Sequence, residues 1–79
     1  MKVTVLVRPK PGILDPQGEA VRNALRHLGF TVHDVRVGRV IDVELDGVDA
    51  EEARAMASRM SEQLLANPLI ETFEIEVHP

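Results

Sequence analysis

The stretch Lys10-Pro11-Gly12-Ile13-Leu14-Asp15-Pro16-Gln17-Gly18 decides how the first half of this chain folds. Proline and glycine interrupt regular structure, so a strand is predicted to end before this stretch and a helix to begin inside it. Asp15 has the side-chain acceptor that an N-cap needs, and Pro16 suits the first helical position. A glycine at position 18, in the first turn, costs roughly 1 kcal/mol relative to alanine. Either backbone approaches Gly18 closely, for example from another chain, or the glycine is simply tolerated there.

Length and composition limit the class of protein. The 79 residues suffice for a single domain, 1–79, whose core must be thin because small domains bury little surface, and association with other chains is a common remedy. The absence of cysteine excludes disulfides and thiolate metal sites. A net charge of −4 with only two aromatic residues disfavours nucleic-acid binding. No apolar run is long enough for a membrane span, so a cytoplasmic protein is expected.

Hydrophobic periodicity predicts the elements around this stretch. Val3, Val5 and Val7 alternate with other residues and predict a strand whose valine face meets the core. After the opening stretch, apolar residues recur at helical spacing, and Gly29 is the expected stop signal. The predicted buried stripe of this helix comprises Ala20, Val21, Ala24, Leu25 and Leu28.

Residues 31–37 and 40–45 are predicted as two strands joined by a tight Gly38-Arg39 turn. This hairpin would place Val37 opposite Val40. Its core face would carry Val32, Ile41, Val43 and Leu45. Asp49 should cap a second helix, which ends at Asn67-Pro68. The stripe of this helix comprises Ala53, Met56, Ala57, Met60 and Leu64.

The last predicted strand runs over residues 69–77, with Phe73, Ile75 and Val77 facing inward. The element order is therefore β-α-β-β-α-β. With right-handed crossovers, this order predicts an α+β, ferredoxin-like sandwich: a four-stranded antiparallel sheet with both helices on one face. That fold hosts many functions and settles none of them.

A search for reactive side chains finds no self-contained active site. There is no phosphate-binding loop motif. The spacing of a helical metal site is absent among His27, His33 and His78, so no metal ligand is expected. No cofactor-binding residue is expected in this chain either. Asp42 and Glu44 share a strand face and are interpreted as part of a solvated acidic rim. No catalytic residue is predicted in this chain.

Two surfaces are candidates for contacts between chains. Apolar residues lie on what should be the solvated face of the sheet, so either a β-bulge shifts the register or a partner covers this face, and a partner is favoured. The predicted self-association set comprises Leu6, Val35, Val37, Val40 and Ile70. A basic rim at the ends of the first strand and of the hairpin could face a partner subunit or its phosphate ligand. The predicted partner-facing set comprises Arg8, Lys10, Gly12, Asp15, Arg36 and Arg39.

Three stretches resemble a known family, the PurS family. The opening stretch 10–18 followed by Ala20-Val21 and Ala24-Leu25 is its specific motif. Residues 35–39, Val-Arg-Val-Gly-Arg, resemble the family's Val-Arg-x-Gly-Lys/Arg hairpin, and residues 64–71 resemble its junction into the last strand. The resemblance covers nearly the whole chain. Ile13 and Arg39 are mild departures from the residues that the family often has.

The resemblance implies a small subunit of phosphoribosylformylglycinamidine synthase, a glutamine-dependent ligase of purine biosynthesis. The complex converts formylglycinamide ribonucleotide to the formamidine with ATP and glutamine. ATP and magnesium would belong to the large subunit (PurL), and a glutaminase subunit (PurQ) would release ammonia. This chain would be a non-catalytic homodimer or tetramer that brings the two together.

A different class of protein is also compatible with the residues. A regulatory module of the same fold could bind a small ligand between subunits. Its glycine-bearing loop after the first strand would then be the ligand site, and ligand-dependent thermal stabilisation would favour this alternative.

Overall fold

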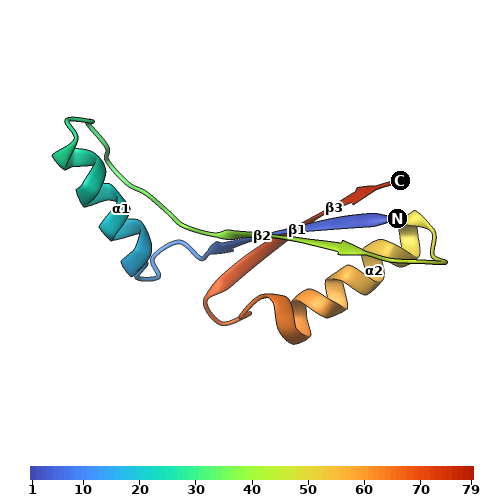
Figure 1. The fold of residues 1–79 in the computed structure, drawn as a ribbon. Coiled ribbons are helices and arrows are strands. Elements are labelled where there is room, and N and C mark those ends of the chain that lie inside the picture. Colours follow the sequence, from blue (N-terminus) through green and yellow to red (C-terminus); the bar gives the residue numbers. More distant parts are fainter.

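The computed structural model describes residues 1–79. Its elements are β1 Lys2–Pro9, α1 Pro16–His27, β2 Arg39–Glu44, α2 Ala50–Met60, the π-helical turn η1 Ser61–Leu65, and β3 Glu71–His78. The three strands form one antiparallel sheet in the order β2-β1-β3 (Figure 1). The α+β class is confirmed, but the predicted fourth strand is absent. Only α2 lies against the sheet.

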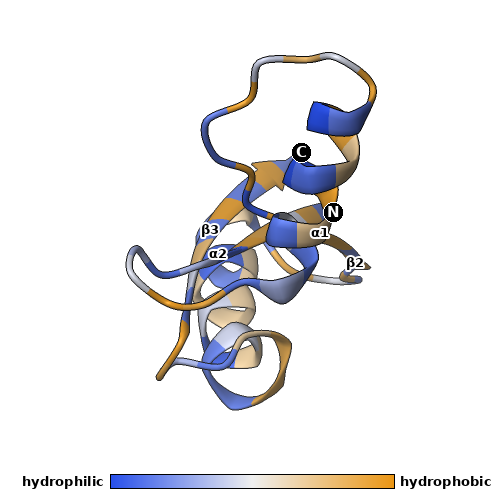
Figure 2. Ribbon diagram, turned by 90° about the vertical axis from the view of Figure 1, so that its left-hand side faces the viewer, coloured by the Kyte–Doolittle hydropathy of each residue, from blue (hydrophilic) through white to orange (hydrophobic).

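The register of the sheet confirms the predicted core face of β1. Val5 pairs with Ile41 on one side and with Ile75 on the other, and all three belong to the core on the sheet face that carries α2 and η1. Val3 and Val7 continue this row, and the three valines of β1 are the most buried large side chains of the sheet. The alternation of hydrophobic and hydrophilic residues along β3 is visible in Figure 2. A central strand bordered on both edges buries its inward residues most completely.

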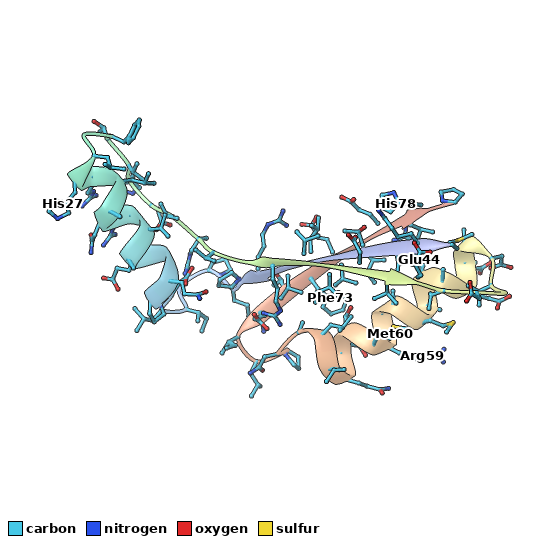
Figure 3. All side chains as sticks on the ribbon, in the orientation of Figure 1. His27, Glu44, Arg59, Met60, Phe73 and His78 are labelled. Atoms are coloured by element: carbon cyan, nitrogen blue, oxygen red, sulfur yellow. The ribbon has the colours of Figure 1, made fainter.

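Small residues allow α2 to approach the sheet closely. Ala53 and Ala57, one helical turn apart, are fully buried against Val3 and Leu45. Met60 and Phe73 fill the space beside them, between α2 and the strands (Figure 3). The stripe predicted for this helix is thus confirmed except at its last position.

Leu64 was predicted in the core and is 82% exposed. The cause is the π-helical turn η1, in which the Ala66 amide donates to the Ser61 carbonyl five residues earlier. The wider turn rotates the following side chains, so Leu65 packs against the core and Leu64 faces outward. A strict 3.6-residue periodicity cannot detect such a turn.

The predicted hairpin across Gly38-Arg39 is wrong. Residues 31–38 form no ladder with β2. They lead into β2 as one extended stretch (Figure 1). β2 pairs with β1, with Val40 opposite Leu6 and Val43 opposite Val3. Gly38 allows this close passage, because a Cβ at this position would lie 2.2 Å from the Val7 carbonyl oxygen. Val32, predicted for the core, lies outside the sheet and is only partly buried.

α1 and residues 29–37 form an arm that projects away from the sheet (Figure 1). The chain measures 49 × 25 × 14 Å, and its radius of gyration is 15.7 Å, whereas a compact domain of this length has a radius of about 12 Å. The stripe predicted for α1 is therefore not part of the chain's own core. Of its five residues only Leu25 is partly buried, and the other four are exposed.

Candidate functional site

Asp15 joins the arm to the body of the protein. One carboxylate oxygen accepts the Gly18 amide at 3.0 Å, which is the predicted N-cap of α1. The other accepts the Val37 amide at 2.8 Å. These bonds, first the one from Val37 and then the one from Gly18, hold the pKa of the Asp15 carboxyl below its ordinary range. One side chain thus fixes both chain segments that lead into the arm.

Gly18 is where these two segments come closest. It is buried in the first turn of α1, and a Cβ added there would lie 2.2 Å from the Val35 carbonyl oxygen. Of the two alternatives for this glycine, a close backbone approach is the one that the structure shows, and the neighbour is a segment of the same chain. Only glycine permits this contact without displacement.

Arg36 completes this joint. Its guanidinium donates to the Ile13 carbonyl at 2.7 Å and to the Lys10 carbonyl at 3.4 Å. The side chain therefore folds back over the loop between β1 and α1. We call Asp15, Gly18, Val35, Arg36 and Val37, together with the carbonyls of Lys10 and Ile13, the arm joint.

Arg39, where β2 begins, has a similar role within the chain. Its guanidinium binds both carboxylate oxygens of Glu71, at 2.6 and 3.0 Å, and donates to the Leu65 carbonyl at the end of η1. The Glu71 carboxylate also accepts the Asn67 amide at 2.7 Å. The hydrogen bond from Arg39 lowers the pKa of Glu71, and the same bond raises the pKa of Arg39.

The sheet face opposite α2 is largely polar. Leu6 and Val40 form its apolar pair, as their strand parity predicted. Beside them, the Thr4 hydroxyl donates to Asp42 at 2.6 Å, and its oxygen lies 3.1 Å from the His78 Nε2 atom. Figure 3 shows His78 and Glu44 on this side of the strands. This trio, drawn from three strands, was not found from the sequence, because its members are 38 and 74 residues apart.

Several large apolar side chains are exposed. They are Leu14, Val21, Leu28, Phe30, Val40, Leu64, Leu69 and Ile70. Val21, Leu28 and Phe30 belong to the arm. Leu69 and Ile70 belong to the corner before β3, which begins at residue 71 rather than at residue 69. An apolar surface this extensive, split between the arm and the body, is typical of a protein that contacts other chains.

Three clefts bring predicted residues together, and the one of about 370 Å³ is lined by Gly12, Asp15, Val35 and Arg36, among others. Another of about 340 Å³ is lined by Arg8, Arg36, Arg39, Leu6 and Val40, among others, and so combines residues of the partner-facing and self-association sets. The third, of about 230 Å³, lies between Ile70, Val37 and Asp15. The predicted hairpin placed Val35 and Val37 on the same sheet face as Leu6 and Val40. This prediction is wrong, because Val35 and Val37 lie in the arm. Gly12, with φ of +83°, sits at an exposed turn of the joint loop.

The structure holds no group of three or more histidine, aspartate or glutamate side chains that could bind a metal ion. Neither α1 nor α2 is long and apolar enough to cross a bilayer. The fold and these contacts define a small α+β protein whose distinguishing features are an unpacked helical arm and exposed apolar surfaces.

Comparison with known proteins places the chain within this class. Residues 2–79 match the family described as PurS: Phosphoribosylformylglycinamidine (FGAM) synthase. The chain is 38% identical over 77 residues to the phosphoribosylformylglycinamidine synthase subunit PurS of Methanocaldococcus jannaschii, covering 96% of this chain and 93% of that protein. This chain belongs to the PurS family.

Solved structures of PurS proteins support the same family assignment. The crystal structure of PurS from M. jannaschii superposes with a TM-score of 0.85 at 36% identity, covering 98% of this chain and 94% of that one. A chain of PurLQS from Thermotoga maritima superposes with a TM-score of 0.86 at 30% identity, covering 95% and 93%.

Proposed function

We propose that this chain is the PurS subunit of a phosphoribosylformylglycinamidine synthase and acts there as a non-catalytic assembly subunit. The observation that carries this proposal is the likeness, over nearly the full length, to a chain of a structure described as PurLQS. The complex would convert formylglycinamide ribonucleotide, ATP and glutamine to formylglycinamidine ribonucleotide. ATP and magnesium would act in the large subunit, PurL, and ammonia would come from the glutaminase subunit, PurQ. This chain would hold the two together in the cytoplasm.

The surface of the chain supports self-association as part of this function. Its solvent-accessible area is 5603 Å², whereas a compact monomer of 8.8 kDa exposes about 4,800 Å². The excess of about 800 Å² reflects the extended shape of the chain, in which the arm leaves apolar side chains such as Leu28 and Phe30 exposed to a partner. The proposed contact residues are Leu6, Val35, Val37, Val40 and Ile70.

The proposed partner-facing rim comprises Arg8, Lys10, Gly12, Asp15, Arg36 and Arg39. The charged members of this rim differ in whether they already form ion pairs or hydrogen bonds within the chain. Lys10 forms no ion pair, and the ion pair of Arg8 with Glu74 is exposed. Asp15 and Arg39 are bound within the chain and would shape the rim rather than contact a partner directly. Lys10 and Arg8 are thus the cations through which a negatively charged partner surface would be recognised.

Reconstitution tests this function. Glutamine-dependent and ammonia-dependent synthesis should be measured with the large and glutaminase subunits, with and without this chain. An assembly subunit is expected to raise the glutamine-dependent rate strongly and the ammonia-dependent rate less, because it couples two active sites. Full glutamine-dependent activity without the chain would contradict the proposal.

Self-association is tested by Val37→Asp, with His33→Asp as the matched control in the same extended segment. Burial of an unpaired charge at position 37 should reduce the mass measured by light scattering, whereas an exposed position should tolerate it. An unchanged mass for Val37→Asp would remove residue 37 from the interface.

A ligand-binding regulatory module is the second candidate, and one cleft favours it. This cleft of about 370 Å³ lies at the arm joint, and its charged lining residues include Glu19, Arg22, Asp34 and Arg36. The Arg22 Nε atom is buried without an acceptor. Charges of both signs in one cleft suit an amino acid. Stabilisation of the chain by free amino acids in a thermal melt would support this candidate, and an unchanged Tm would reject it.

A further inference from the structure

Three arginines from separate segments line one cleft. Arg8 lies near the end of β1, Arg36 lies in the extended segment of the arm, and Arg39 begins β2. They are three of the nine lysine and arginine residues, and the cleft of about 340 Å³ between them has no carboxylate in its lining. The whole chain carries a net charge of −4, so this cleft is positive against the overall balance. Positive charge concentrated in a hollow attracts an anion.

The extended segment brings the three arginines to one place. It enters β2 beside the end of β1, where Val7 pairs with Arg39 (Figure 1). Gly38 lets the backbone pass this closely, since a Cβ there would lie 2.2 Å from the Val7 carbonyl oxygen. The cations that the sequence predicted for a basic rim therefore surround a single cleft.

Arg36 carries the charge that the chain compensates least. Its guanidinium donates to the carbonyls of Ile13 and Lys10, which are neutral acceptors. Its one ion pair, with Asp34, spans 4.0 Å. A guanidinium has five N–H donors, so these contacts leave donors of Arg36 free for a ligand.

Arg8 and Arg39 are both paired, but to different degrees. Arg8 contacts Glu74 at 2.9 Å, and both side chains are more than half exposed, so this pair is weak and exchanges readily with another anion. Arg39 is held by both carboxylate oxygens of Glu71, which itself does not line the cleft. Arg8 is therefore free to turn towards a ligand, whereas Arg39 forms a fixed wall.

The remaining wall of the cleft is apolar. Leu6 and Val40 pair across β1 and β2, and Val40 is 64% exposed. A phosphate group matches the fork of donors that a guanidinium presents, and the less polar part of the same molecule fits against the apolar pair. The volume is that of a small-molecule site rather than of a groove for a folded partner.

We propose that this cleft binds the phosphate group of a small phosphomonoester, with Arg36 and Arg8 as donors and with Leu6 and Val40 beside the organic part. The inference goes beyond the proposed function, because an assembly subunit needs no small-molecule ligand of its own. The site also differs from the cleft at the arm joint, where carboxylates lie among the arginines and suit a molecule of mixed charge.

Titration with three probes tests the proposal. Amide shifts of the ¹⁵N-labelled chain are followed with inorganic phosphate, AMP and adenosine at constant ionic strength. Phosphate and AMP should saturably shift the amides of Val7, Arg8 and Gly38, which line the cleft, whereas adenosine, which lacks the phosphate, should not. Shifts from adenosine equal to those from AMP, or no saturable shift with either phosphate probe, would overturn the proposal.

A pair of matched variants locates the binding. Arg8→Gln should raise the Kd of AMP at least about fivefold, the size of one exposed charged contact. Arg59→Gln removes the same charge from an exposed position of α2 and should change this Kd less than about twofold. Arg8 is exposed, so both variants should fold, and circular dichroism checks this. Arg36 is kept because it also holds the arm joint.

Two results from these variants and probes would overturn the proposal. Equal losses for Arg8→Gln and Arg59→Gln would mean that AMP responds only to net charge. A hexaglutamate peptide that shifts the same amides at lower concentration than AMP would assign the cleft to an acidic segment of a partner. Neither result bears on glutamine-dependent activity of the reconstituted complex, which tests the assembly function separately.

Discussion

The contact between Arg39 and Glu71 gives the sharpest prediction about stability. Replacing Glu71 by alanine removes the bidentate contact with Arg39 and the acceptor for the Asn67 amide. It also releases the guanidinium that holds the Leu65 carbonyl at the end of η1. The junction between η1 and β3 should therefore loosen.

The size of this loss in stability depends on how far the Glu71 and Arg39 side chains are exposed to solvent. Hydrogen bonds to charged groups contribute about 1.5–3 kcal/mol each when buried. The Glu71 side chain is 16% exposed and the Arg39 side chain 47% exposed, so water compensates part of the loss. Glu71→Ala should lower the free energy of unfolding by about 2 kcal/mol, and Glu71→Gln, which keeps an acceptor, by about 1 kcal/mol.

Urea denaturation followed by circular dichroism at fixed chain concentration measures this loss. With a urea dependence of about 1 kcal/mol/M for a small domain, the midpoint should fall by about 2 M for Glu71→Ala. Glu74→Ala is the matched control on the same strand. Its carboxylate pairs with Arg8 at 2.9 Å, but the two side chains are 68% and 56% exposed. The control should change stability by less than about 0.5 kcal/mol.

The pH dependence supplies an independent test of the same contact. Since the pKa of Glu71 is lowered by folding, its contribution is complete above the pKa of the unfolded chain and is lost as pH falls through the folded pKa. The gap in stability between wild type and Glu71→Gln should therefore begin to narrow below about pH 4, where an unfolded glutamate becomes protonated, and close only below the lowered pKa of the folded chain. Equal midpoints for the Glu71 and Glu74 alanine variants at pH 7 would refute the reasoning.

Three further predictions concern the core and the arm joint. Val5→Ala should cost about 2–3 kcal/mol in urea denaturation because Val5 is fully buried in the central strand, whereas Val40→Ala, 64% exposed, should cost less than about 0.5 kcal/mol in the dissociated chain. Gly18→Ala should force the arm to shift, because its Cβ would lie 2.2 Å from a carbonyl oxygen, and small-angle scattering should show an altered radius of gyration. The pKa of Asp15 is lowered by the Val37 and Gly18 amides, so the joint's stability is present at neutral pH and lost in acid, where the protection of these two amides against hydrogen exchange, relative to the intrinsic rate at the same pH, should fall.

Local patterns in the sequence determined the elements whose signals lie within a few residues. The caps of both helices, at Asp15 and Asp49, are where the short acceptor side chains predicted them. Gly29 follows α1 with φ of +95°, as a C-terminal stop should. The alternating valines of β1 face the core. In each case the cause is the backbone or side chain of the residue itself, so its neighbours in sequence suffice.

Only the tertiary structure decided where the first helix lies. Its apolar stripe predicts that something covers it, but periodicity does not say whether the cover belongs to the same chain. The sequence 31–45 predicted a hairpin, but Gly38 lies in an extended segment, where the lack of a side chain permits the close passage beside Val7. The Asp15–Val37 bond, which spans 22 residues, favours the extended form.

The side-chain contacts between distant segments also could not be predicted from the sequence. Arg39 was predicted to face a partner, and its guanidinium binds Glu71 and the Leu65 carbonyl at the end of the π-helical turn, 32 and 26 residues away in the chain. Thr4, Asp42 and His78 meet only because three strands pair in one register. Local sequence therefore determined the two helices and the strands β1, β2 and β3, whereas long-range packing decided that residues 31–38 form no strand and which elements meet, since pairing energies between distant residues have no local signature.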